Sequence, residues 1–294
     1  MKIVKFRGGY GNQLFQYSFL RELQLKYNCE DVKADLAYFS TIKENSVYIP
    51  RIEKLNVKID RATQADLSTV CILKHTSDPS TLIYRAGIIF EKIFNHQYYL
   101  ESDRAHRDIE SILGYQYYDG YWQSWKHLNG IENELRNEIT LKEKMSEKSR
   151  NAIDKFSSEN SVFIGIRRGD YLATSRLRRH FGSYDNAYFN KAIGIMKEKV
   201  ADPVFYVFSN DIDWIKENMR FDCKVNYREF EDQTSDTEEL FVMSACKHAI
   251  IVNSTFYWWG AWLIENEQKT IIAPQRWFAD GSPIDIVPDT WIKI

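Results

Sequence analysis

The chain has 294 residues, and its 39 Lys and Arg against 41 Asp and Glu give a formal net charge of −2. At about 100–200 residues per domain this length indicates two domains, and the near-zero charge argues against a nucleic-acid-binding protein, which is normally basic. Four scattered cysteines without a CxxC pair indicate neither a zinc site nor a disulfide framework, and no stretch approaches the roughly 18 apolar residues of a membrane span.

The first predicted unit is a strand, a glycine-rich turn and a helix. Residues 2–6 are predicted as a short strand, and apolar residues at helical spacing predict a helix over about residues 13–26. A glycine backbone in the turn can approach a ligand closely, and the amides that follow can donate hydrogen bonds. The turn resembles a dinucleotide fingerprint, but Leu14 replaces the third glycine. The candidate ligand contacts of this turn are Gly9, Gly11, Asn12 and Gln13.

The middle of the chain predicts a domain boundary rather than a motif. Residues from about 40 to 120 mix short apolar runs with aromatic residues and place no element clearly. Residues 131–160 are charged and rich in helix formers, and a polar run at 157–161 follows them. We therefore expect an N-terminal domain over residues 1–157 and a C-terminal domain over residues 158–294.

Strands and helices alternate clearly in the second half. Continuous apolar runs predict strands that are buried on both faces of a parallel sheet, at residues 162–166, 204–208, 249–252 and 270–273. Helical spacing of apolar residues predicts a helix after each of the first three strands. This alternation predicts a doubly wound, Rossmann-like sheet, in which ligands bind beyond the carboxyl ends of the strands.

Residues suited to phosphate follow three of these strands. Arg167 and Arg168 come directly after the first strand, and a helix begins soon after the third. Arginine forks and the free N–H groups of a helix N-terminus both bind phosphate oxygens. The pattern predicts a diphosphate site that needs no metal, unless the arginines only pair with acids such as Asp170. The other members of this set are Ser209 and Asn210 after the second strand, and Asn253, Ser254 and Thr255 after the third.

Two further features admit more than one interpretation. Asp211 and Asp213 have the spacing of a metal-binding acidic pair, but acids are also favoured where a helix begins. His180 lies in the loop that follows the arginine pair, where a histidine is either simply solvated or able to accept a proton.

Several segments are similar to motifs of one enzyme family. Their order and spacing agree with the α-1,2-fucosyltransferases, glycosyltransferase family 11, from residue 8 to about residue 275. The sequence therefore resembles that family over most of its length. The matching segments are GGYGNQLFQY at residues 8–17, DGYWQS at 119–124, IRRGDY at 166–171, FSND at 208–211 and NSTFYWWGAWL at 253–263.

The resemblance implies a GT-B architecture, an α/β fold of two Rossmann-like domains facing an interdomain cleft. It implies an inverting transfer of L-fucose from GDP-β-L-fucose to the 2-hydroxyl of a terminal β-galactoside, with no metal and no cofactor. The N-terminal domain would hold the acceptor and the C-terminal domain the GDP-sugar donor. The expected setting is bacterial O-antigen or surface-glycan synthesis in the cytoplasm, with peripheral membrane contact at most and no nucleic acid.

The resemblance also implies roles for individual residues. Arg167 would hold the β-phosphate and stabilise the charge that develops on it, with Arg168 as a second donor. Glu239, or Glu238 beside it, falls where related enzymes pair an acid with guanine. Asn12 would reach the donor from the first domain. The diphosphate would be lined from the helix N-terminus by Ser254, Thr255 and Phe256.

Removal of the acceptor proton calls for a separate assignment. Asp170 is the first candidate general base and His180 the second, although Asp170 is also suited to order the arginine loop. The departing phosphate is itself able to take the proton. The arginine motif of the family usually begins with His, and Gly165 stands at that place here. Any contact made by that imidazole is therefore absent or replaced.

Two other classes of protein remain open on the sequence alone. A nucleotide-sugar epimerase or hydrolase of GT-B-like fold would rearrange or release the sugar without an acceptor. A non-catalytic glycan-binding protein would use the aromatic surplus, which is 15% of the residues. Incubation of GDP-fucose with and without lactose distinguishes an epimerase or hydrolase from a transferase. Titration with GDP distinguishes a glycan-binding protein, which would have no affinity for the nucleotide.

Overall fold

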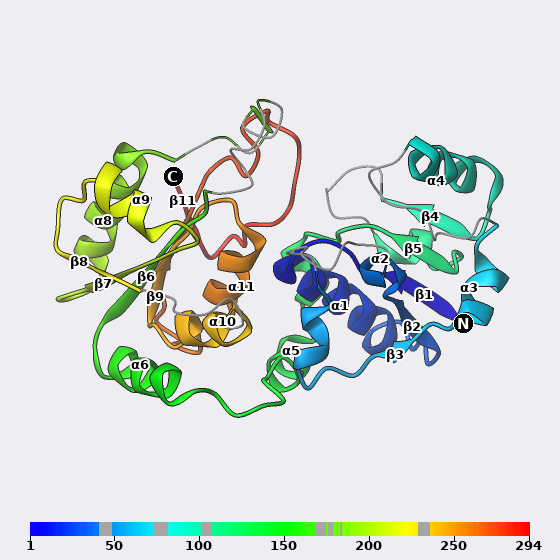
Figure 1. Ribbon diagram of the computed structural model, residues 1–294, viewed down its shortest axis with the longest axis horizontal. Helices are drawn as coiled ribbons and strands as arrows, with labels where there is room; N and C mark the ends of the chain where they lie inside the picture. Colours follow the sequence, from blue (N-terminus) through cyan, green and yellow to red (C-terminus); the bar gives the residue numbers. More distant parts are fainter. Residues whose placement is uncertain are drawn as a thin grey trace. The chain divides into compact units, whose positions relative to one another are not determined.

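The computed structural model describes residues 1–40, 49–72, 82–101, 108–168, 175, 179–180, 182, 184–228 and 236–294. The chain forms two compact units, each built on its own sheet (Figure 1). The N-terminal domain comprises Met1–Lys142 with Pro283–Ile286, and the C-terminal domain comprises Glu143–Ser282 with Val287–Ile294. Every strand pairing inside the two sheets is parallel. The expected α/β class with two Rossmann-like domains is therefore confirmed.

The division between the domains comes earlier in the chain than the expected boundary at residues 157 and 158. Helix α6 (Glu147–Ser158) belongs to the C-terminal domain, because its start is bonded to α10 (Asp236–Ser244). The hydroxyls of Ser146 and Ser149 donate hydrogen bonds to Glu238 Oε2 over 2.8 and 2.6 Å. The charged residues 131–160 therefore belong to both domains, with α5 (Glu132–Glu138) in the N-terminal domain and the mostly exposed α6 in the C-terminal domain.

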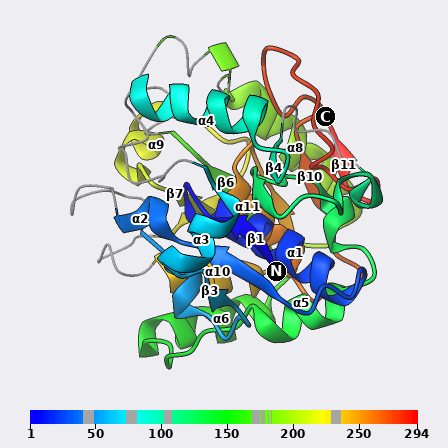
Figure 2. The same cartoon turned by 90° about the vertical axis from the view of Figure 1, so that its right-hand side faces the viewer.

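Five strands form the sheet of the N-terminal domain: β1 (Lys2–Lys5), β2 (Val32–Asp35), β3 (Asp60–Arg61), β4 (Tyr98–Leu100) and β5 (Tyr117–Asp119). Their order is β3-β2-β1-β5-β4, so β1 lies at the centre (Figure 2). The chain adds β2 and β3 on one side of β1, and β4 and β5 on the other. A topological switch point, where ligands bind in open α/β sheets, therefore lies between β1 and β5.

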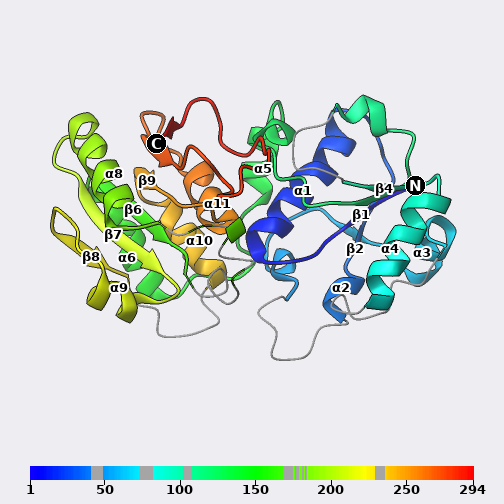
Figure 3. The same cartoon turned by 90° about the horizontal axis from the view of Figure 1, so that it is seen from above.

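Helices cover both faces of this first sheet. Helix α1 (Tyr10–Leu25) lies on one side, and α3 (Gln64–Val70) and α4 (Leu82–Phe94) lie on the other (Figure 3). Further helices of the domain are α2 (Ala37–Ser40), α5 (Glu132–Glu138) and the 3-10 helices η1 (Arg51–Lys54), η2 (Ile109–Ile112) and η3 (Trp125–Leu128).

Aromatic side chains fill both layers of this domain. On one face, Phe19 of α1 stacks on Trp122 with 3.7 Å between ring centroids. On the other face, Val70 of α3 packs with Ile3 and Tyr117 of the central strands. Burial of such side chains contributes roughly 1.5–3 kcal/mol each, which explains how very short strands are held in register.

Six strands form the sheet of the C-terminal domain: β6 (Ser161–Ile166), β7 (Val204–Ser209), β8 (Val225–Tyr227), β9 (His248–Ile250), β10 (Ile271–Ala273) and β11 (Ile292–Lys293). The four predicted strands match β6, β7, β9 and β10 to within two residues at each end. The order is β11-β10-β9-β6-β7-β8, and the chain grows outward in both directions from β6 and β9. The second switch point therefore lies between β6 and β9.

Helices also lie on both sides of this second sheet. Helices α8 (Asn186–Lys199) and α9 (Ile212–Asn218) lie on one side, and α10 and α11 (Thr255–Leu263) on the other (Figure 1). Trp258 and Trp259 of α11 are core residues, since both are fully buried. In the described ranges, no helix has both the length and the apolar character needed to cross a membrane.

Candidate active site

The second sheet brings predicted phosphate-binding residues to its switch point. Strands β6 and β9 are neighbours and parallel, so their carboxyl ends lie at the same edge. Arg167 directly follows β6, and Ser254 lies between β9 and α11. A cationic side chain and a helix N-terminus thus follow the two strands that flank the switch point. This placement fits the predicted diphosphate site.

Arg168 is held against its own domain. Its guanidinium carbon lies 3.0 Å from the centre of the Trp214 ring, and its Nε lies 3.5 Å from Asp211 Oδ2. Its backbone N–H donates to Asn210 Oδ1 over 3.1 Å. These contacts tie the end of β6 to the end of β7. Arg168 and Asn210 are therefore suited to shape the loop.

The start of α11 forms the opposite side of the switch point. Ser254 is the buried N-cap residue, and its carbonyl accepts the Trp258 N–H over 2.9 Å. Its hydroxyl does not make the usual capping bond to α11. Asn253 is also buried and donates from Nδ2 to the Trp277 carbonyl over 2.8 Å. Thr255 and Phe256 are half-buried in the first turn of α11.

Ser209 and Asp211 shape the turn that follows β7. The buried Ser209 hydroxyl oxygen accepts the Asp211 N–H over 3.1 Å. Asp211 is the N-cap residue of α9 and Asp213 lies in its first turn, which confirms the helix-start interpretation of this acidic pair. In the part of the chain that the structure describes, no three His, Cys, Asp or Glu side chains form a cluster that could hold a metal ion.

The glycine in place of the family's usual histidine has a steric reason. A Cβ atom on Gly165 would lie 2.7 and 2.8 Å from Cδ1 and Cδ2 of the Tyr257 ring, closer than real Cβ atoms approach. The Tyr257 hydroxyl donates to the carbonyls of Phe208 and Ile166 over 3.1 and 3.3 Å. Tyr257 thus occupies the side-chain space of Gly165 and links α11 to the ends of β6 and β7.

Replacement of Gly165 by Ala is expected to destabilise the C-terminal domain by about 1–3 kcal/mol, because the new methyl group overpacks a fully buried strand. Thermal unfolding of the variant measures this loss. Gly194 on α8 is a matched control, since a Cβ there meets no atom within 4 Å. Gly194→Ala should keep or raise the melting temperature. Equal melting temperatures for wild type and Gly165→Ala would show that Tyr257 moves away at no cost.

Two adjacent acids on α10 have different surroundings. Glu239 is 4% exposed, and its Oε2 lies 3.9 Å from Arg228 Nε. Glu238 instead accepts hydrogen bonds from Ser146 and Ser149. Burial alone would raise the pKa of Glu238, but the hydrogen bonds from Ser149 and Ser146 lower it. Glu238 therefore stabilises the start of α6, and Glu239 is the better candidate to pair with the guanine base.

His180 is paired with an acid that the sequence alone does not single out. Its Nδ1 lies 2.5 Å from Asp280 Oδ2, and its ring stacks on Phe278 with 4.3 Å between centroids. Hydrogen bonds from His180 and Ser282 hold the pKa of Asp280 below its usual range. A carboxylate on Nδ1 orients the imidazole so that Nε2 can take a proton. Asp170, the first candidate base, lies outside the described residues.

The glycine turn of the N-terminal domain begins α1 and is tied down by Gln13. Gly8 has φ +78°, a conformation that favours glycine, and the Gly9 carbonyl accepts the N–H groups of Asn12 and Gln13. Gln13 is fully buried, donates to the carbonyls of Gly8 and Ile49, and accepts from a backbone N–H. A donor contact through this side chain would require these bonds to break. We therefore assign Gln13 to the structure of the turn.

Asn12 joins two of the segments that resemble family motifs. Its Oδ1 accepts a hydrogen bond from Gln123 Nε2 over 2.8 Å, and the Asn12 side chain is half-buried. Asn12 and Gly11 lie in the first turn of α1, and Gln123 follows β5. The N-terminal residues therefore gather near the switch point of the first sheet.

The chain belongs to Glycosyl transferase family 11, whose sequence profile matches residues 2–293. The protein is therefore of the glycosyltransferase class, and the resemblance drawn from the five segments is confirmed.

Three characterised relatives agree with this assignment. The chain is 30% identical to an alpha-1,2-colitosyltransferase of Escherichia coli, over 99% of this chain and 98% of that protein. It is 26% identical to the O-antigen biosynthesis glycosyltransferase WbnK of Escherichia coli, over 98% of both chains. It is also 26% identical to human galactoside alpha-(1,2)-fucosyltransferase 1, over 49% of this chain and 42% of the human protein.

Proposed function

We propose that the chain is an inverting, metal-independent galactoside 2-α-L-fucosyltransferase that uses GDP-β-L-fucose. The observation that carries the proposal is that Arg167 and the start of α11 follow the two strands that flank the switch point of the second sheet. The similarity to a galactoside fucosyltransferase and to two bacterial glycosyltransferases supports the sugar and the acceptor class. The C-terminal domain then binds the donor and the N-terminal domain the acceptor.

The proposed chemistry is electrostatic. Cleavage of the glycosidic bond places negative charge on the β-phosphate of the leaving GDP and positive charge on the fucose carbon. Donors that are already oriented toward that oxygen stabilise the transition state more than the ground state. Arg167 and the N–H groups at the start of α11 are these donors, with contributions from Ser254, Thr255 and Phe256.

The acceptor hydroxyl attacks the fucose carbon as GDP leaves, and its proton passes to a base. His180 is a candidate for this role because Asp280 orients its ring. Asp170 is the other candidate. A well-placed general base raises the reaction rate about 10²–10⁴-fold.

Glu239 is assigned to the guanine edge of the donor. Glu239→Gln is expected to weaken GDP binding about tenfold or more, because a hydrogen bond to a charged group contributes about 1.5–3 kcal/mol. Isothermal titration with GDP measures the change. Glu238→Gln is the matched control: it should leave GDP affinity unchanged and lower the melting temperature, since Glu238 bonds Ser146 and Ser149. Equal GDP affinities for wild type and Glu239→Gln would exclude the assignment.

Initial rates with GDP-fucose and lactose test the proposed function. Fucosylated lactose, formed equally with and without a chelator, is the expected product. Sugar release that does not depend on lactose would identify a hydrolase, and absence of GDP binding would point to a glycan-binding protein. An activated colitose donor is the competing substrate, because one relative is a colitosyltransferase. If the enzyme prefers that donor, the proposed identity of the transferred sugar is wrong, but the proposed donor site still holds.

The cellular setting is part of the same proposal. Similarity to an O-antigen biosynthesis glycosyltransferase supports a role in bacterial surface-glycan synthesis. On this similarity we place the enzyme in the cytoplasm, with peripheral membrane contact at most. Cell fractionation followed by immunoblotting tests this placement.

A further inference from the structure

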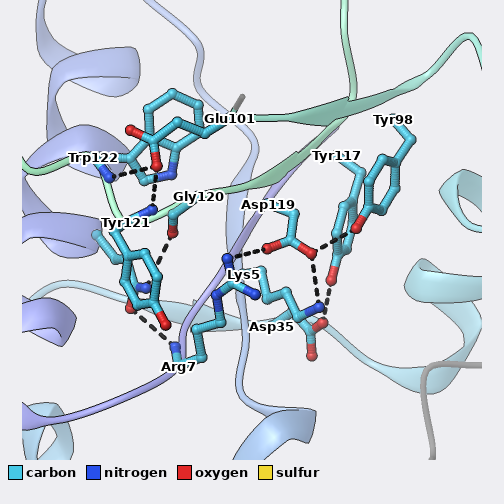
Figure 4. Close-up of polar contacts among 11 residues, drawn as sticks. Lys5, Arg7, Asp35, Tyr98, Glu101, Tyr117, Asp119, Gly120, Tyr121 and Trp122 are labelled. Atoms are coloured by element: carbon cyan, nitrogen blue, oxygen red, sulfur yellow. Dashed lines mark hydrogen bonds and ion pairs between the residues drawn. The ribbon is translucent and has the colours of Figure 1, made fainter. Parts of the chain in front are cut away.

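The carboxyl edge of the first sheet holds an ionic cluster that the proposed donor site does not use. Lys5 ends β1 and Asp119 ends β5, so these side chains meet across the first switch point. Lys5 Nζ lies 2.8 Å from Asp119 Oδ2, and Arg7 Nη2 lies 3.1 Å from Asp119 Oδ1 (Figure 4). The Tyr98 hydroxyl donates to Asp119 Oδ2 over 2.6 Å.

Asp119 is held as an anion inside the domain. Its side chain has no exposed surface, and that of Lys5 is 3% exposed. Complete burial would raise the pKa of Asp119, but Arg7, Lys5 and the hydrogen bonds from Lys5 and Tyr98 hold it well below its usual range. A buried ion pair is weak evidence for stability, because desolvation cancels much of the attraction. Its place at a switch point therefore suggests a second role.

Arg7 is the member of the cluster that reaches the surface. Its side chain is 18% exposed, and its guanidinium carbon lies 4.6 Å from the centre of the Tyr121 ring. Its backbone N–H donates to Gln16 Oε1 over 3.0 Å, and Gln16 Nε2 donates to the Gly120 carbonyl over 3.1 Å. Gln16 therefore holds the backbone of Arg7. Asp119 binds one edge of the guanidinium group, and Tyr121 lies against its face.

The turn that carries Tyr121 is itself built around a carboxylate. The N–H groups of Tyr121 and Trp122 donate to Glu101 Oε2 over 2.6 and 3.3 Å. A Cβ on Gly120 would lie 2.8 Å from that oxygen, and Trp122 has φ +54°, which is rare for a bulky residue. Such strained conformations cluster at functional sites. The turn fixes the ring that covers Arg7.

We propose that Arg7 is an acceptor-binding residue, that its guanidinium donates hydrogen bonds to the hydroxyl oxygens of a neutral sugar, and that Asp119 is its positioning residue. The planar guanidinium carries five N–H donors in a fixed arrangement, which suits neighbouring hydroxyls on one sugar. A phosphate group is a poor alternative ligand for Arg7, because this cluster contains more carboxyl groups than cations. The carboxyl groups are those of Asp35, Asp119 and Glu101, and the cations are Lys5 and Arg7. Naming the sugar a terminal galactoside rests on the proposed function.

Initial rates at varied GDP-fucose and varied lactose test the role of Arg7. Arg7→Gln should raise the KM for lactose at least tenfold, the change that about 1.4 kcal/mol of lost binding produces, and leave the KM for GDP-fucose within twofold. Arg7→Lys keeps the charge but not the planar group, and should raise the lactose KM about threefold. Arg61→Gln is the matched control, since Arg61 ends β3 at the same sheet edge and is exposed, paired with Glu53. It should match wild type.

Lactose KM values that equal wild type in folded Arg7→Gln, or in Arg7→Lys where Arg7→Gln does not fold, would overturn the inference. A change confined to the donor KM would do the same. The positioning role of Asp119 is tested with Asp119→Asn at a temperature where it is folded. Its lactose KM should rise as in Arg7→Gln. Mere loss of stability would reduce the active fraction and leave both KM values unchanged.

Ligand-observed NMR of lactose, with and without GDP, separates this inference from the proposed function. If wild type transfers no fucose, the proposed function fails, and lactose binding that weakens in Arg7→Gln but not in Arg61→Gln still supports the acceptor site. If wild type transfers fucose while lactose binding is unchanged in Arg7→Gln, the acceptor site alone is wrong.

Discussion

Replacement of Arg167 by Ala should lower kcat for fucosyl transfer by about 10²–10³, which corresponds to the roughly 3–4 kcal/mol that one oriented donor supplies to a developing oxyanion. The effect falls on kcat because the charge on the departing phosphate is largest in the transition state. Arginine stays protonated at any working pH, so the defect should be independent of pH. Initial rates at saturating GDP-fucose and lactose measure it, and circular dichroism confirms the fold.

The neighbouring arginine makes the experiment discriminating. Arg168→Ala removes the same charge one residue away, but Arg168 lies on Trp214 and beside Asp211. We expect it to lower the melting temperature, with a smaller effect on kcat than Arg167→Ala. If instead Arg168→Ala abolishes transfer and Arg167→Ala leaves turnover at the wild-type level, the phosphate contact belongs to Arg168. If both variants turn over normally, the electrostatic mechanism is wrong.

The second half of the fold could be predicted because its signal is local. Strand β6 is a continuous buried run, and the residues after β6, β7 and β9 must share one edge in any parallel sheet. The strands between residues 40 and 120 gave no such signal. They have two or three residues each, and their aromatic side chains also form buried polar bonds, as the Tyr117 hydroxyl does with Asp35 Oδ2 over 2.6 Å.

The parts of the site that escaped prediction depend on contacts between distant residues. His180 and Asp280 are 100 positions apart, and Lys5 and Asp119 are 114 apart. No periodicity or motif records which acid meets which base across such distances. Gly165 shows the same limit, because the Tyr257 ring that requires it belongs to a helix more than 90 residues later. Sequence indicates which side chains follow the strands at one edge of the sheet, and packing decides which of them face that edge.

Replacement of Asp119 by Asn should destabilise the N-terminal domain by about 3–5 kcal/mol, because Lys5 then keeps a buried charge without its anion. For a domain of this size the loss corresponds to at least about 6 °C in melting temperature, which calorimetry measures. Asp285→Asn is the matched control in the same domain. Asp285 pairs with Lys126 at 2.6 Å, but both side chains are about 40% exposed, so its loss should cost about 0–1 kcal/mol.

The pH dependence of this effect has a definite sign. The pKa of Asp119 is lower in the folded state than the value of 3.8 for an unperturbed Asp, so folding favours the ionised form. Its contribution to the free energy of unfolding is complete above about pH 4 and is lost as the pH falls from there through the folded-state pKa. The stability difference between wild type and Asp119→Asn should therefore be constant at neutral pH and narrow below about pH 4.

A second substitution shows whether the buried charge is the cause. Lys5→Met removes the ammonium group that Asp119→Asn leaves behind, so the double variant should recover part of the lost stability, although each single substitution is destabilising. Non-additivity of this kind is expected for residues in direct contact. Additive losses in the double variant, or an Asp119→Asn penalty no larger than that of Asp285→Asn, would mean that Lys5 and Asp119 are not strongly coupled. Arg7 would then lack the rigid anion that its proposed role in acceptor binding requires.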